Sequence, residues 1–223
     1  MKTSISIFIS IFSIFVSSLY SQEVVPKYNI LISGASFATE NNGWFEIGCE
    51  TIGANPINRA IGGESIAKAA NRMVNGELYS MEELENIDVF VIMQVHEADV
   101  FDETQLLDNY EDYQTPLDLS NYAIAFDYVV KKYLSDCYNL KNNLKSKYFG
   151  SKAGKPARII LCTHWHDARI RYNKSVRKLA EKWGFALVEF DKNIGFSMNQ
   201  LHPVTKEQVS LIYSNDEQII RGE

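Results

Sequence analysis

The chain has 223 residues, of which 46% are hydrophobic and 22% are charged, and its formal net charge is −6. This composition excludes a disordered or collagen-like chain, because it supplies enough apolar material for a packed core. The negative charge also disfavours nucleic acids and anionic membrane surfaces as partners, since both repel a protein of that sign.

The first residues have the pattern of a secretory signal peptide. Lys2 precedes an apolar run from Ile5 to Val16 that is too short to span a membrane. The small or polar residues Ser17, Ser18, Ser21 and Gln22 then precede the charged start of the mature chain. We therefore expect residues 1–22 to be cleaved on export to the periplasm or the exterior. Residues 23–223 are expected to form a single domain that does not insert into a membrane, and its oligomeric state is left open.

Export would permit disulfide bonds, but the chain has only three cysteines, Cys49, Cys137 and Cys162. At least one of them must stay unpaired. We expect all three to be buried and to act as small hydrophobic residues.

From Tyr28 onward, short apolar runs alternate with longer amphipathic segments. The pattern predicts strands over residues 28–33, 58–61, 88–94, 158–163 and 185–190. It predicts helices over residues 64–75, 119–148, 168–183 and 203–213, with Gly184 ending the third of them. Strands that alternate with helices are typical of a parallel, doubly wound α/β sheet.

One connection departs from this scheme, because residues 97–115 are long for a loop and rich in acidic side chains. A solvated surface loop is the favoured interpretation, and a calcium site is the alternative.

The four histidines follow predicted strands or lie in late loops. His96 follows the third strand, His164 and His166 follow the fourth, and His202 precedes the last predicted helix. Ligands of parallel α/β sheets bind outside the carboxyl ends of the strands. The histidines therefore indicate a functional site at that edge.

Two further turns at the same edge carry residues suited to catalysis. Ser36 lies just after the first strand, where a tight turn exposes a hydroxyl beside main-chain N–H groups. Gly62 and Gly63 follow the second predicted strand and let a backbone N–H approach a ligand closely.

Taken together, these segments resemble the sequence blocks of the SGNH (GDSL-type) serine esterase superfamily. The matching segments are Gly34–Ser36, Asn58–Glu64, Gln94–Glu97 and Asn199–His202. The resemblance covers the mature chain and implies a flavodoxin-like three-layer α/β/α sandwich with a parallel five-stranded sheet.

The resemblance also implies roles for individual residues. Ser36 would be the nucleophile and His202 the general base, and the oxyanion hole would comprise the Ser36 and Gly63 N–H groups with His96. His96 stands where the family has asparagine, and a neutral imidazole can still donate one N–H. Asn199 stands where the family has the aspartate that orients the histidine.

The site would therefore work as a Ser36–His202 dyad, use a carboxylate elsewhere in the chain to orient His202, or only bind its ligand. The candidates for that carboxylate are Asp191, Asp167 and Glu97. The residues expected to support the site are Gln94, Glu97, His164, His166 and Asp191.

The resemblance implies an ester hydrolase without a metal or other cofactor. Together with the expected export of the chain, it favours an ester outside the cytoplasm as the substrate, such as an O-acetyl group on a glycan. A metal-dependent hydrolase is one alternative, because His164 and His166 have the spacing of two metal ligands. A non-catalytic carbohydrate-binding domain is another, with Asn199, Glu97 and exposed aromatic residues such as Trp44 and Trp165 as its binding groups. Nucleotide binding is disfavoured, because no phosphate-binding glycine pattern follows the first strand.

Overall fold

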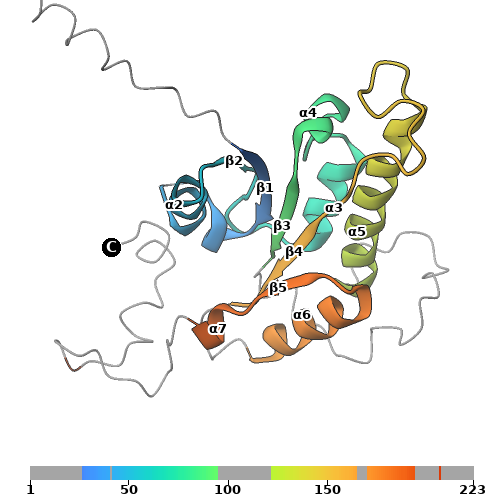
Figure 1. Cartoon of the computed structure of the whole chain (residues 1–223). Coiled ribbons are helices and arrows are strands. Elements are labelled where there is room, and N and C mark those ends of the chain that lie inside the picture. Colours follow the sequence, from blue (N-terminus) through green and yellow to red (C-terminus); the bar gives the residue numbers. More distant parts are fainter. Residues whose placement is uncertain (1–26, 41, 95–121, 165–169, 194–205, 207–223) are drawn as a thin grey trace, which may run out of the picture.

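Five parallel strands form one sheet in the order β2-β1-β3-β4-β5 (Figure 1). In this computed structural model, the described residues are 27–40, 42–94, 122–164, 170–193 and 206. The strands are β1 (Tyr28–Gly34), β2 (Ala54–Asn58), β3 (Val89–Met93), β4 (Ile159–Cys162) and β5 (Ala186–Val188). This strand order is the flavodoxin-like one, in which the direction of winding reverses between β1 and β3.

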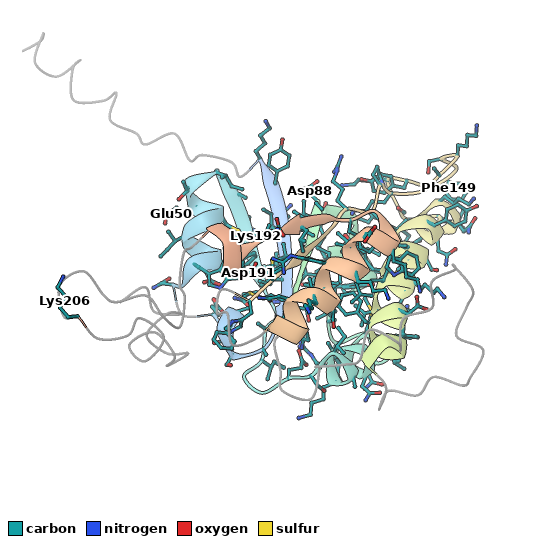
Figure 2. All side chains as sticks on the ribbon, turned by 90° about the horizontal axis from the view of Figure 1, so that it is seen from below. Glu50, Asp88, Phe149, Asp191, Lys192 and Lys206 are labelled. Atoms are coloured by element: carbon teal, nitrogen blue, oxygen red, sulfur yellow. The ribbon has the colours of Figure 1, made fainter. Side chains whose placement is uncertain are left out.

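Helices cover both faces of the sheet. Figure 1 shows α2 (Trp44–Thr51) on one side, and α3 (Ile66–Val74) and α5 (Tyr122–Asn139) side by side on the other. The remaining helices are α4 (Met81–Asn86), α6 (Ile170–Trp183), α7 (Phe190–Asn193) and the short 3₁₀ turns η1 (Ser36–Ala38) and η4 (Leu140–Asn142). Helix α6 packs on β4 and β5, and α7, which carries Asp191 and Lys192, follows β5 (Figure 2). The expected three-layer α/β/α sandwich is therefore confirmed.

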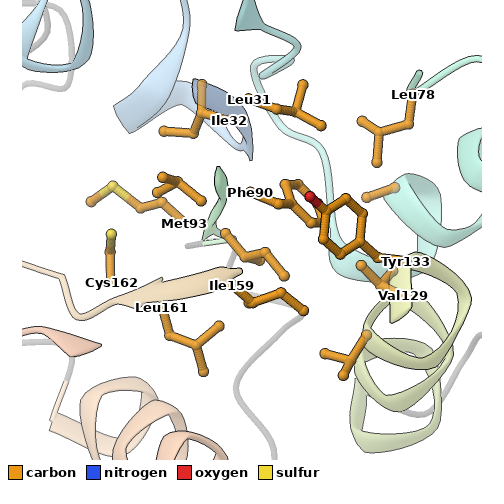
Figure 3. Close-up of a cluster of buried hydrophobic side chains, with 14 of the residues drawn as sticks. Leu31, Ile32, Leu78, Phe90, Met93, Val129, Tyr133, Ile159, Leu161 and Cys162 are labelled. Atoms are coloured by element: carbon orange, nitrogen blue, oxygen red, sulfur yellow. The ribbon is translucent and has the colours of Figure 1, made fainter. Parts of the chain in front are cut away.

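The core lies between β1, β3 and β4 and the helices α3 and α5. Leu31, Phe90 and Tyr133 are fully buried in it (Figure 3). The β3 sequence is apolar throughout because the strand is paired on both sides and covered on both faces. All three cysteines are free and buried, as expected.

The predicted position of the second strand was wrong. The strand is β2 at Ala54–Asn58, and residues 59–61 belong to the connection that follows it. Pro56 made this segment a poor match to a strand pattern, but β2 is the edge strand, where a residue without an N–H donor is tolerated.

Other element boundaries also differ from the prediction. The helix expected to reach residue 148 ends at Asn139, and a 3₁₀ turn and bonded turns replace its last two turns. Helices α2 and α4 were not predicted, although Ser80 and Glu83 form a capping box that begins α4. Strand β5 ends at Val188, so Phe190 begins α7 instead of ending a strand.

Several expectations fall on residues outside the described part of the chain. These are the signal peptide at residues 1–22, the acidic segment at residues 97–115 and, except for Lys206, the closing helix at residues 203–213. Lys206 is not helical and has φ +64°, so the predicted helix is wrong at that residue.

Candidate active site

Strands β1, β3 and β4 run parallel and end at the same edge of the sheet. The register pairs Gly34 with Met93, so Gln94 follows β3 beside the turn that contains Ser36. His164 follows β4 at the same edge. The structure thus brings together three of the residues expected at the site, Ser36, Gln94 and His164.

The turn after β1 presents Ser36, which is partly exposed. Ala35 N–H donates to the Met93 carbonyl at 3.4 Å, and Ala38 N–H donates back to the Ala35 carbonyl at 3.0 Å. A Cβ atom at Gly34 would lie 2.7 Å from Ala38 Cβ and 2.9 Å from Met93 O. Only glycine allows the strand to turn this closely against β3, and the turn fixes the backbone that carries Ser36.

Side chains from other elements hold η1 in place. The Trp44 indole N–H donates to the Phe37 carbonyl at 2.7 Å, and Asn58 Nδ2 donates to the Ala38 carbonyl at 2.7 Å. Asn58 Oδ1 accepts from Ala60 N–H at 2.9 Å, so one side chain joins the serine turn to the connection after β2. This role of Asn58 was not predicted, although the residue lies in one of the matched blocks.

The two glycines after β2 form the tip of a turn between Ile61 and Glu64. Glu64 N–H donates to the Ile61 carbonyl at 3.0 Å, and Gly63 has φ +72°. A positive φ at the third of four turn residues is typical of a type II turn, which favours glycine there. Ile61 N–H donates to the Gly34 carbonyl at 3.0 Å, so this glycine turn is bonded directly to the end of β1.

The far end of the glycine turn is held by Gln94 and Arg72. The Gln94 amide donates to the Glu64 carbonyl at 2.9 Å, and Arg72 donates to both carboxylate oxygens of Glu64 at 3.1 and 3.2 Å. Burial raises the pKa of Glu64, and the charge of Arg72 opposes that shift. Every polar group of Glu64 is therefore anchored, which fixes the turn that carries Gly63.

Gln94 itself is completely buried, and its side-chain oxygen has no hydrogen-bond partner among the described residues. A buried hydrogen-bond acceptor without a partner lowers the stability of the fold, so such atoms are rare in native proteins. Gln94 lies after β3 beside the serine turn, and its amide is bonded to the glycine turn, so it joins the two turns.

His164 is buried behind the serine turn. Its ring packs edge-on against Phe37, with ring centroids 4.4 Å apart at 88°. Asn173 fixes its backbone on both sides, accepting from His164 N–H at 2.8 Å and donating to its carbonyl at 3.1 Å. With 3% of its surface exposed, His164 supports the turn from inside the protein.

Asp191 lies on α7, bonded to the end of β4. Arg177 donates to both of its carboxylate oxygens at 2.7 Å, and the Thr163 hydroxyl donates to one of them at 2.8 Å. Arg177 also binds Glu189, so the guanidinium bridges two carboxylates. The charge of Asp191 is thus already offset by a cation, whereas a carboxylate that orients a catalytic histidine offsets the charge of that histidine.

The described residues bear on both alternative functions, a carbohydrate-binding domain and a metal-dependent hydrolase. Trp44, expected as an exposed aromatic residue, is half-buried, packs against Phe45 and Phe190, and uses its N–H within the fold. Its role is therefore structural, contrary to the expectation for a sugar-binding surface. Within the described ranges, no group of three or more His, Cys, Asp or Glu side chains is placed to hold a metal ion.

The remaining predicted residues lie outside the described part of the chain. They are His96, Glu97, Trp165, His166, Asp167, Asn199 and His202. In the part that is described, no helix combines the length and the apolar character needed to cross a membrane.

The fold and the two turns define a flavodoxin-like α/β domain with a serine and a glycine turn at the carboxyl edge of its sheet. The chain belongs to the family DUF5040, described as a domain of unknown function, whose model matches residues 27–223. No curated protein matches the sequence.

Several solved structures are similar to this chain. An α/β hydrolase enzyme from the metagenome of Lake Arreo, Spain, LAE5, is 15% identical with a TM-score of 0.45, over 89% of this chain and 96% of that chain. The SGNH-hydrolase family esterase AlinE4 is 16% identical with a TM-score of 0.38, over 86% and 93% of the two chains. A GDSL-like lipase candidate from Parabacteroides merdae is 18% identical with a TM-score of 0.32, over 72% and 76%.

Proposed function

We propose that the chain is an exported serine ester hydrolase of the SGNH type, with Ser36 as its nucleophile. The observation that carries the proposal is the 3.0 Å hydrogen bond from Ile61 N–H to the Gly34 carbonyl. It ties the Gly63 turn to the strand end that presents Ser36. A hydroxyl nucleophile and a main-chain donor for an oxyanion are the two parts that acyl transfer requires at one place.

In the proposed mechanism, His202 takes the proton of Ser36 Oγ as the hydroxyl attacks the ester carbonyl. The negative charge that develops on the carbonyl oxygen is stabilised by the N–H groups of Ser36 and Gly63, with His96 as a third donor. His202 then protonates the departing alcohol, and water hydrolyses the acyl enzyme with His202 again as the base. Asn199 would accept a hydrogen bond from the imidazole and set its orientation.

The anchors around Glu64 fit this mechanism. An oxyanion donor acts only if it is fixed before the charge develops, because reorganisation would otherwise add to the barrier. Gln94 and Arg72 fix Glu64 on one side of Gly63, and Gly34 fixes Ile61 on the other side.

We propose an O-acetyl ester on a glycan as the substrate. An enzyme exported by the predicted signal peptide would meet acetylated glycans outside the cytoplasm. Ser36 is partly exposed, which suits attack on a small acyl group attached to a large carrier.

The test is hydrolysis of an aryl acetate and release of acetate from an acetylated glycan by the Ser36→Ala variant. The matched control is Ser33→Ala, which removes a hydroxyl three residues earlier on β1. Ser33 is 1% exposed, and its hydroxyl has no hydrogen-bond partner among the described residues. We expect Ser36→Ala to abolish both reactions and Ser33→Ala to retain them. Full activity of Ser36→Ala would exclude the serine mechanism.

A further inference from the structure

The segment between α5 and β4 has a charge opposite to that of the whole chain. Residues 141–158 contain six of the 22 Lys and Arg residues and no Asp or Glu, in a chain of net charge −6. Lys145, Lys147 and Lys152 are exposed, and Lys141 is partly exposed. We call residues 141–152 the basic loop.

The charges of the basic loop are not neutralised within the described part of the chain. No ion pair there joins any of its four lysines to a carboxylate. Lys147 Nζ donates to the amide oxygen of Asn86 at 3.2 Å, and Glu85 accepts from the Lys147 main-chain N–H at 3.4 Å. Lys141 lies over the ring of Tyr138.

The same loop exposes large apolar side chains. Leu144 is 80% exposed and Phe149 is 53% exposed, and Tyr138, at the end of α5 beside the loop, is 49% exposed. Figure 2 shows Phe149 projecting from the periphery of the molecule, well apart from Asp191. Apolar side chains among uncompensated lysines indicate a surface that contacts a partner.

This exposure does not come from a loosely held loop. Gly150 N–H donates to the Lys141 carbonyl at 2.9 Å and closes the loop, while Phe149 N–H donates to Ser146 O at 3.0 Å. At its base, Lys155 N–H donates to the Cys137 carbonyl at 2.9 Å. A closed, internally bonded loop of this length is often functional, and a fixed conformation lowers the entropy lost when it binds.

The loop lies at the edge of the sheet opposite to the candidate active site. It follows the end of α5 and precedes the first residue of β4, so it is at the amino ends of the strands (Figure 1). A surface bound there would leave the carboxyl edge, with Ser36, facing away from it.

We propose that the basic loop docks the protein on an anionic lipid bilayer. Lysines attract anionic headgroups, and Leu144 and Phe149 insert between them. The negative net charge of the whole chain does not exclude this partner. Salt screens charges that are more than about 10 Å away, so the electrostatic potential at the loop depends mainly on its own lysines. An aliphatic side chain as exposed as Leu144 favours a bilayer over a nucleic acid or an anionic polysaccharide, since neither of these has an apolar interior to receive it.

The test is co-sedimentation of the purified chain with phosphatidylcholine vesicles that contain or lack phosphatidylglycerol. One variant, Lys145→Gln/Lys152→Gln, removes two loop charges, and a second, Leu144→Ser, removes the apolar tip. The matched control is Lys68→Gln/Lys174→Gln, which changes the net charge equally at exposed lysines of α3 and α6. All four proteins share the same N-terminus, so differences between them report the loop.

We expect binding only to the anionic vesicles, and weaker binding in high salt. Removing two loop lysines should weaken it about 30-fold, from about 1 kcal/mol for each lysine near an anionic surface, and the control should bind as the parent chain does. Leu144→Ser should weaken it about tenfold, with an unchanged melting temperature because the side chain is exposed. Three outcomes would each overturn the proposal. They are an equal loss of binding in the loop and control variants, no binding to anionic vesicles, and binding to DNA or polygalacturonate without binding to vesicles.

Discussion

The glycine turn offers a sharp test of the site, because Gly63 can be changed without steric conflict. Gly63 has φ +72°, and a Cβ atom added there would have no neighbour within 4 Å. The substitution Gly63→Ala therefore acts on the backbone conformation alone. An alanine at this φ favours rotation of the peptide between residues 62 and 63 toward a type I turn, which redirects the Gly63 N–H.

The structure supplies a matched control in Gly184, which ends α6. Gly184 has φ +67° and also has no neighbour within 4 Å of an added Cβ. Both alanine variants should lower the free energy of unfolding by about 1–2 kcal/mol, the strain of an L-residue in the left-handed region. Only Gly63→Ala should also lower kcat, by about 10²–10³-fold, the effect of losing one oxyanion donor.

The assay combines urea unfolding with aryl acetate kinetics, with rates divided by the number of active sites titrated with a covalent serine probe. Dividing by titrated sites separates a slower enzyme from a smaller folded fraction. Equal kcat values for the two variants would refute the assignment of Gly63 as an oxyanion donor.

Four further predictions follow from particular contacts. Gly34→Ala should lower the free energy of unfolding by about 3 kcal/mol in urea titrations and abolish esterase activity, because its Cβ would meet Met93 O at 2.9 Å; a stable, active variant would contradict the tight serine turn. Gln94→Met should lower kcat about tenfold at nearly constant KM, since a shifted donor matters only in the transition state, and a change confined to KM would count against its positioning role. Burial raises the pKa of Cys49 to about 11 and that of Cys162 to about 12, so above a pH of about 8.5 the unfolded thiols lose protons that the folded thiols keep. The free energy of unfolding should therefore fall as the pH rises toward 11, and it should fall less steeply in a Cys49→Ala variant. Equal slopes for the two proteins would contradict the raised pKa of Cys49. Dialysis against a chelator should leave aryl acetate hydrolysis unchanged, whereas loss of activity restored by zinc would favour the metal-hydrolase alternative.

The sequence predicted the parts of the fold that local patterns determine. The runs that became β1 and β3 are apolar because both strands lie inside the sheet, and the glycine turn followed from two adjacent glycines. Strand β2 was misplaced because an edge strand needs hydrogen bonds on one side only, so Pro56 and two asparagines are tolerated there. The local sequence pattern does not show that a strand will lie at the edge of the sheet.

The supports of the candidate site could not be predicted in the same way. Gln94 and Glu64 are bonded across 30 residues, and Asn58 and Ala38 across 20, so both contacts exist only once the sheet has formed. Trp44 illustrates the converse error. Its aromatic character suggested a sugar-binding surface, but its N–H satisfies a backbone carbonyl of the serine turn.

The central claim is that Ser36 is a nucleophile activated by an imidazole at the carboxyl edge of the sheet. Mass spectrometry of the chain after reaction with a fluorophosphonate tests this claim most directly, with peptide mapping to locate the adduct and His202→Ala for comparison. We predict a single adduct on Ser36 that forms far more slowly in His202→Ala. An adduct on another residue, no adduct at all, or an equal rate in both proteins would contradict the claim.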